Sequence, residues 1–111
     1  MGRRPAPEWV VRESVPRYGL SAPERAVLLC LWDHADRAGL TFPSHPTIVR
    51  ETGFAERTTK AATAVLHRRG FIRREDGRTP YEKAPHDRKA VRWIVEPTPV
   101  WIDRRLVQEM H

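Results

Sequence analysis

The sequence predicts an α+β fold with three core helices, a small antiparallel β-sheet that forms a wing, and an extra helix at the C-terminus. Apolar residues recur with helical spacing in three segments, over about residues 22–38, 45–52 and 56–69, and a glycine follows each segment. Short runs of β-branched and aromatic residues follow the first and third segments, as expected for strands. A length of 111 residues suits one such domain.

The prolines divide the chain into three parts. Residues 1–20 contain three prolines and are expected to form an extended N-terminal arm, with Trp9 and its apolar neighbours packing on the domain. Residues 21–96 are expected to form the domain itself. Two further prolines close it, and residues 97–111 are predicted to form a C-terminal helical extension.

The first core helix has a clear start. Ser21 is the predicted N-cap, and Glu24 completes a capping box with it. The run from Ala26 to Trp32 is apolar on nearly every side, which is typical of a helix covered by others. The helix is expected to end near Arg37–Ala38, with Gly39 as its C-terminal stop.

The second and third helices form a pair joined by a tight turn. Ser44 is expected to cap a helix over about 45–52, and Gly53 supplies the turn, where a positive φ is needed. The third helix is predicted over 56–69 and is stopped by Gly70. Its expected inward positions are Thr59, Ala62, Val65 and Leu66.

Three short segments are predicted to be strands. The first covers about residues 40–42, the second begins at residue 71, and the return strand covers 91–95. The segment between the last two is basic and contains two prolines, so a long wing loop is expected there instead of a regular hairpin.

The positive charge is concentrated in one part of the chain. The formal net charge is +6, and residues 50–92 carry twelve Lys or Arg and six acids, against six and five in residues 1–49. A solvated basic surface is one interpretation. Because the excess falls on the second and third helices and the wing, we favour binding to a polyanion.

Residues 20–95 resemble the winged helix-turn-helix domains of phage and plasmid replication and regulatory proteins, which are related in fold to GntR-like and MarR-like regulators. The resemblance rests on the apolar helix AVLLCLWDHAD, on FPS at 42–44 and on TGFAERTTKAATAVLHRRGFI at 52–72. The family usually has serine where this chain has Ala55, so the third helix lacks its expected N-cap, worth about 1 kcal/mol.

The resemblance implies that the third helix enters the DNA major groove and that the wing contacts the backbone or the minor groove. Arg57 is the expected base reader, because a guanidinium can bind guanine O6 and N7 together. The expected DNA contacts are Ser44, His45 and Thr47 at the start of the second helix, Arg57, Thr58, Lys60 and Ala61 on the third helix, and Arg73, Arg74, Arg78, Arg88 and Lys89 on the wing.

We therefore expect a sequence-specific protein that binds double-stranded DNA, most simply a transcriptional regulator. A replication-origin or partition-site binding protein of a phage or plasmid is the nearest alternative, and a protein–protein interaction adaptor is the alternative from another class. A homodimer is expected on palindromic sites. Its expected contact is the C-terminal segment, through Trp101, Ile102, Leu106 and Met110, unless that helix folds back on its own core.

Other function classes lack support in the sequence. No segment is long and apolar enough to span a membrane, and a single cysteine, Cys30, suits a reducing cytoplasm, where the protein is expected to associate with the nucleoid. No nucleophile–base arrangement indicates an enzyme. His34 lies four residues after Cys30, but no second pair has ligand spacing, so no metal is expected. No cofactor and no small-molecule ligand are expected either.

Overall fold

The computed structural model describes residues 5–79 and 91–97. Four helices and three short strands follow one another along the chain, and together they have the α+β layout of a winged helix-turn-helix. The elements are α1 (Glu8–Arg12), α2 (Ala22–Asp33), β1 (Leu40–Thr41), α3 (His45–Thr52), α4 (Glu56–Arg69), β2 (Ile72–Arg74) and β3 (Trp93–Val95). The predicted fold class is therefore confirmed for the described part of the chain.

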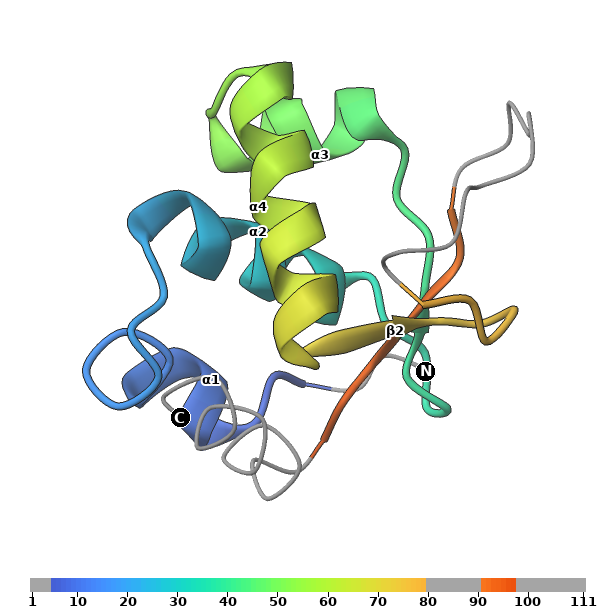
Figure 1. Ribbon diagram of the computed structural model, residues 1–111, viewed down its shortest axis with the longest axis horizontal. Coiled ribbons are helices and arrows are strands. Elements are labelled where there is room, and N and C mark those ends of the chain that lie inside the picture. Colours follow the sequence, from blue (N-terminus) through green and yellow to red (C-terminus); the bar gives the residue numbers. More distant parts are fainter. Residues whose placement is uncertain (1–4, 80–90, 98–111) are drawn as a thin grey trace.

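The three strands form one antiparallel sheet in the order β1-β3-β2. Leu40 lies opposite Ile94 in one pairing, and Arg73 lies opposite the same residue in the other. In Figure 1, α4 runs across the front of the molecule, with α3 near its first turn and β2 directly after its last turn. The sheet therefore lies beside the C-terminal half of α4.

The core lies where α2, α3 and α4 meet. The three helices all pack on one another, and α2 supplies the most buried apolar residues. This agrees with the apolar character of the α2 sequence, which leaves almost no polar face to present to water. The largest fully buried side chains are Trp32, Phe71, Leu28, Leu31 and Leu66.

The extended conformation predicted for residues 5–20 is wrong. Glu8–Arg12 form α1, and Trp9 and Val10 are buried with the residues of the main core. The Trp9 ring packs edge-on against Tyr18 at 5.5 Å between ring centroids and lies 6.0 Å from the Phe71 ring. Pro7 does not interrupt α1, because it stands at the N-cap, before the first helical residue. The free energy gained by burying Trp9 and Tyr18, nine residues apart, therefore outweighs the cost of the prolines in this segment.

The first core helix also ends earlier than predicted. α2 stops at Asp33, and the next residues form a turn in which the Asp36 carboxylate accepts from the amides of Ala38 and Leu40, at 2.8 and 3.0 Å. Gly39 has a φ of +85°, and a Cβ at this position would lie 3.2 Å from the carbonyl oxygen of Val95. Gly39 thus allows the chain to approach β3 and does not terminate the helix.

The predicted starts of the helices are confirmed. Ser21 and Glu24 form the capping box of α2, Ser44 caps α3, and Gly53 takes a φ of +79° in the turn between α3 and α4. No helix in residues 5–79 or 91–97 is long and apolar enough to cross a membrane. The predicted C-terminal helix lies outside the described residues.

Candidate nucleic-acid interface

α4 is anchored through one face. Leu66 is fully buried, and Thr59 and Ala62 are buried with it, while Val65 is half-buried. The hydroxyl of Thr59 donates to the carbonyl of Glu56 at 2.9 Å, so its burial leaves no unmatched polar atom. The inward face predicted for this helix is therefore correct in outline.

The opposite side of α4 is an exposed ridge of small and basic side chains. We define this α4 ridge as Arg57, Lys60, Ala61, Ala64 and Arg68, all of which are exposed. Their spacing of three and four residues places them on one side of a helix. Arg57 and Arg68 stand about 16 Å apart along the helix axis, at 1.5 Å per residue.

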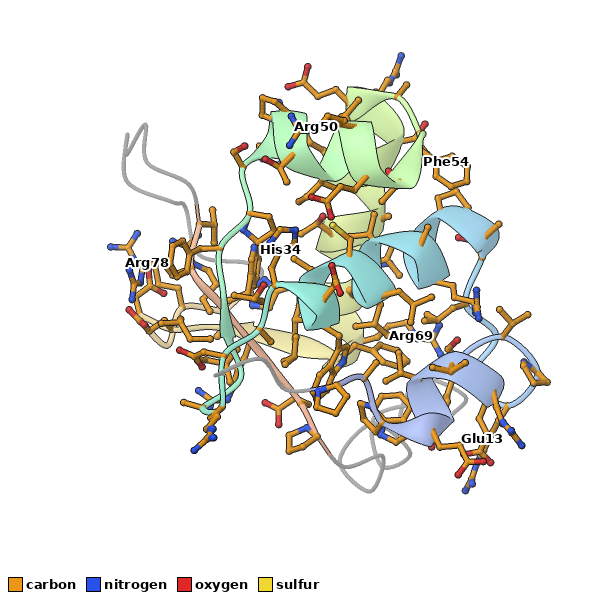
Figure 2. The ribbon with its side chains drawn as sticks, turned by 180° about the vertical axis from the view of Figure 1, so that it is seen from behind. Glu13, His34, Arg50, Phe54, Arg69 and Arg78 are labelled. Carbon is orange, nitrogen blue, oxygen red and sulfur yellow. The ribbon has the colours of Figure 1, made fainter. Side chains whose placement is uncertain are left out.

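Arg68 was not among the predicted DNA contacts. In the sequence it stands next to Arg69, and both were equally consistent with a role at the helix C-terminus. The structure separates them: Arg69 turns inward, donates to the carbonyl of Tyr18 and lies 5.2 Å from the Phe71 ring centroid. Figure 2 shows the Arg69 side chain among the inner residues of the molecule. The helical spacing from Arg57 to Arg68 is the signal that identifies the outward residue.

Lys60 on the α4 ridge is held by a neighbouring acid. Its Nζ atom lies 3.0 Å from Oε1 of Glu56, one turn earlier, and both side chains are more than half exposed. The ammonium group hydrogen-bonds the Glu56 carboxylate and lowers its pKa below 4.5. A phosphate that approaches Lys60 must therefore compete with this carboxylate.

Thr58 does not lie on the ridge. It is half-buried and lines a shallow groove against the start of α2, together with Ser21 and Glu24. Arg57 borders the same groove from its exposed side. Thr58 therefore lies at the edge of the exposed face, beside α2, and its predicted contact with DNA stays a prediction.

The start of α3 offers fewer free donors than its sequence suggests. The Ser44 hydroxyl accepts from the Thr47 amide at 3.3 Å, and the two hydroxyls lie 3.0 Å apart. Pro46 has no amide hydrogen. Ser44 is exposed, and His45 and Thr47 are half-buried. A phosphate at this helix end would therefore rely on the amides of Ser44 and His45.

The described arginines of the wing all face carboxylates. Arg73 bonds Glu96 at 2.9 Å, Arg74 makes two bonds to Asp76 at 3.2 and 2.8 Å, and Arg78 lies 3.6 Å from Asp76. The side chain of Arg74 is only 17% exposed, so its bonds to Asp76 stabilise the turn and little of it is accessible at the surface. Arg78 lies at the outer edge of the wing in Figure 2.

A further arginine of the wing, Arg92, was not among the predicted DNA contacts. Arg92, just before β3, bonds Glu75 at 3.0 Å and lies 4.8 Å from the ring centroid of Phe42, which is 51% exposed. Such a cation–aromatic pair orders both side chains at the surface. Nearby, Trp93 of β3 is half-buried and packs edge-on against His67 of α4, with 4.9 Å between the ring centroids.

The His67–Trp93 contact joins α4 to β3. Arg88 and Lys89 of the predicted wing set lie outside the described residues. So do the predicted dimer contacts Trp101, Ile102, Leu106 and Met110. These six assignments remain predictions.

Residues 18–72 match the family model of a helix-turn-helix domain, a stretch that covers α2, α3 and α4 and reaches the first residue of β2. No curated protein and no solved structure matches the chain. The match coincides with the part of the structure that holds the three packed helices. The chain therefore contains a helix-turn-helix domain, and DNA binding is the general function of such domains.

Proposed function

We propose that this protein is a sequence-specific, double-stranded DNA-binding transcriptional regulator that inserts α4 into the major groove. The observation that carries the proposal is the α4 ridge, where two alanines separate basic side chains on a helix anchored through its opposite face. Alanine side chains let a helix approach the floor of a groove closely, and arginine is the side chain best suited to guanine.

The dimensions of the ridge suit this role. The major groove of B-DNA is about 12 Å wide. The spacing of about 16 Å between Arg57 and Arg68 along the helix axis exceeds that width. With Arg57 at the base edges, Arg68 then stands near the phosphates that border the groove. We assign base reading to Arg57 and phosphate contact to Arg68.

The wing supplies the second contact. Arg73 and Arg92 keep half or more of their side chains exposed; Arg73 lies in β2, and Arg92 directly precedes β3. Each must exchange a carboxylate partner for a phosphate, which is feasible because exposed ion pairs contribute little stability. We propose that the wing follows the flanking backbone and that the protein acts as a non-enzymatic homodimer through its C-terminal segment.

The test is selection from a pool of random duplexes by the full chain at near-physiological salt. The proposal predicts an enriched motif, with two-fold symmetry if the homodimer forms. Replacing both Arg57 and Lys60 with alanine should abolish enrichment. Arg12→Ala is the matched control. Arg12 lies on α1, its side chain is largely exposed, and its ion pair within the described residues is with Glu8.

The other outcomes separate the alternatives. Salt-sensitive binding without a motif would contradict sequence-specific reading. No binding to any duplex would contradict DNA binding and favour the adaptor alternative. A motif that occurs as clustered repeats beside replication genes, and not at promoters, would favour the role in replication or partition.

A further inference from the structure

Three potential metal ligands converge between α2 and α3, on residues that the proposed DNA contacts do not use. Cys30 lies in the last turn of α2, and His34, four residues later, is the C-cap of that helix, so the two side chains lie on the same side of it. Glu51, in the last turn of α3, points to the same place. The ligand atoms of the three side chains all lie within 4.8 Å of one another, the one such cluster in the described part of the chain.

The distances within this cluster are those of a nearly formed site. Nε2 of His34 lies 2.9 Å from both carboxylate oxygens of Glu51, and Sγ of Cys30 lies 3.8 Å from Glu51 Oε1. Around a tetrahedral zinc ion, sulfur, nitrogen and oxygen ligands stand about 3.4–3.6 Å apart, as follows from bonds of about 2.0–2.3 Å. No two ligand atoms are more than 4.8 Å apart, so the largest separation exceeds the tetrahedral spacing by no more than about 1.4 Å.

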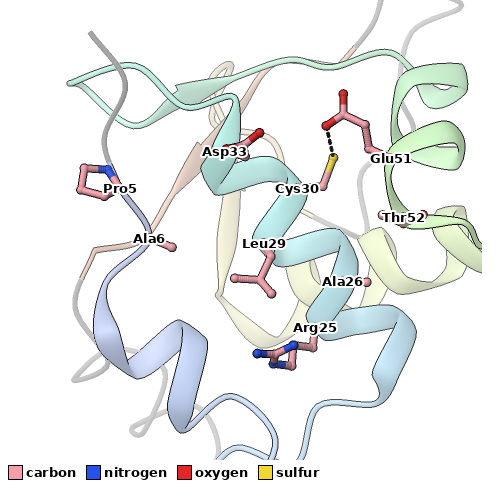
Figure 3. Close-up of a pocket in the computed structure, with 9 residues that line it drawn as sticks. All are labelled: Pro5, Ala6, Arg25, Ala26, Leu29, Cys30, Asp33, Glu51 and Thr52. Atoms are coloured by element: carbon pink, nitrogen blue, oxygen red, sulfur yellow. Dashed lines mark hydrogen bonds between the residues drawn. The ribbon is translucent and has the colours of Figure 1, made fainter. Parts of the chain in front are cut away.

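The surroundings favour a cation. Cys30 is 7% exposed, while His34 and Glu51 keep about a third of their side chains exposed, so the site is dry on one side and open on the other. Figure 3 shows Cys30, Glu51 and Asp33 lining one open pocket between α2, α3 and the segment before α1. Asp33 adds a second carboxylate to this pocket, and water reaches the cluster through it.

We propose that Cys30 Sγ, His34 Nε2 and the Glu51 carboxylate bind a divalent transition-metal ion of the zinc type, with water as the fourth ligand. Mixed sulfur, nitrogen and oxygen ligands are those that such ions prefer over magnesium or calcium. Binding replaces the thiol proton of Cys30, which passes to solvent, and leaves a thiolate on the metal.

Hydrogen bonds hold the free cluster together: the Cys30 thiol donates to Glu51 Oε1, and Nε2 of His34 contacts the same carboxylate. An ordinary His34–Glu51 pair explains two of the three side chains, but it does not explain why the only cysteine of the chain lies against the same carboxylate.

The site could not be predicted from ligand spacing along the sequence, because no second pair of ligands follows Cys30 and His34 at such a spacing. The third ligand instead comes from another helix, 17 residues after His34. A metal ion bound there would join α2 to α3 and stabilise the folded domain over the unfolded chain. This inference does not depend on DNA binding.

Titration of the reduced full chain with Co²⁺ tests the proposal, because cobalt substitutes for zinc and its bond to a thiolate absorbs in the near ultraviolet. We expect the band to saturate at one Co²⁺ per chain and Zn²⁺ to displace the cobalt. Cys30→Ser should abolish the band, and His34→Gln and Glu51→Gln should each weaken Co²⁺ binding more than tenfold. Glu8→Gln, which removes an exposed carboxylate of α1, should leave binding unchanged.

Thermal unfolding provides a second readout. Zn²⁺ should raise the melting temperature of the wild-type chain and of Glu8→Gln, but not that of Glu51→Gln, which removes one ligand from a partly exposed position. Absence of the charge-transfer band would overturn the proposal. A band that His34→Gln and Glu51→Gln leave unchanged would also overturn it, since it would mean binding by the thiol alone. So would saturation at half an equivalent, which would mean one ion shared between two chains.

Discussion

Replacing Ala55 with serine should stabilise the domain, because α4 is the one long helix in the described chain that starts without a side-chain cap. α2 and α3 begin at Ser21 and Ser44, and each hydroxyl accepts a hydrogen bond from the third amide of its helix, at 3.3 Å. Ala55 has a φ of −63° and a ψ of 155°, against −70° and 160° for Ser44. A serine would thus find the backbone already in its capping conformation.

The magnitude follows from this match. An N-cap serine is worth roughly 0.5–2 kcal/mol over alanine, with about 1 kcal/mol typical. Ala55 is exposed, so the hydroxyl meets no steric obstacle but competes with water, and we expect about 1 kcal/mol. For a domain of this size, that corresponds to a rise of about 4–6 °C in melting temperature.

Urea and thermal unfolding of four proteins check this reasoning. Ala55→Ser should raise the free energy of unfolding with no change in the urea m-value. Ser44→Ala and Ser21→Ala should each lower it by a similar amount, because each removes one hydroxyl acceptor, while the backbone amide of residue 21 keeps its bond to Glu24. If Ala55→Ser leaves stability unchanged or lowers it while Ser44→Ala destabilises, the first turn of α4 differs from the one described.

Three further predictions concern the N-terminal segment, the wing and the α4 ridge. Trp9→Ala should lower the free energy of unfolding by about 3–5 kcal/mol in urea, since it empties a buried aromatic site; a loss below about 1 kcal/mol would indicate a detachable arm. The backbone amide of Arg78 donates to the Asp76 carboxylate and lowers its pKa from 3.8. This contact therefore stabilises the wing turn above pH 3.8 and is lost as the pH falls through the lowered pKa. A carboxyl NMR titration of Asp76 with a midpoint at or above 3.8 would contradict the contact. Glu56→Gln should tighten binding to DNA, measured by fluorescence anisotropy at low salt, because it removes a negative charge from the ridge and frees Lys60; weaker binding would mean that this end of α4 does not face phosphates.

The helix-turn-helix itself was predictable because its signals are local. A serine cap, a glycine with positive φ and a helical repeat of apolar residues each depend on neighbours a few positions away, and the bounds predicted for α4 agree with the structure. The end of α2 was mispredicted because Asp36 forms its own turn, in which a side chain takes the place of helical hydrogen bonds.

The surface properties were less predictable because they depend on contacts distant in the sequence. The counts of basic residues indicated a positive wing, but Glu96 reaches Arg73 across 23 residues, and Glu75 reaches Arg92 across 17. Arg69 faces inward and donates to the carbonyl of Tyr18, 51 residues earlier, while Arg68 stands at helical spacing from Arg57 and faces outward. The contact between Glu51 and Cys30 was equally hard to predict, because the two residues are 21 positions apart in the sequence.

The proposal that α4 reads bases in the major groove is tested most directly by a double-mutant cycle on the selected DNA motif. Arg57→Ala is combined with replacement of each guanine by 7-deazaguanine, which removes the N7 acceptor from the major groove and leaves base pairing intact. We predict that one replacement weakens wild-type binding about tenfold or more and leaves the Arg57→Ala protein nearly unaffected. Additive losses at every guanine would contradict base reading by Arg57 and require another docking geometry for the helix.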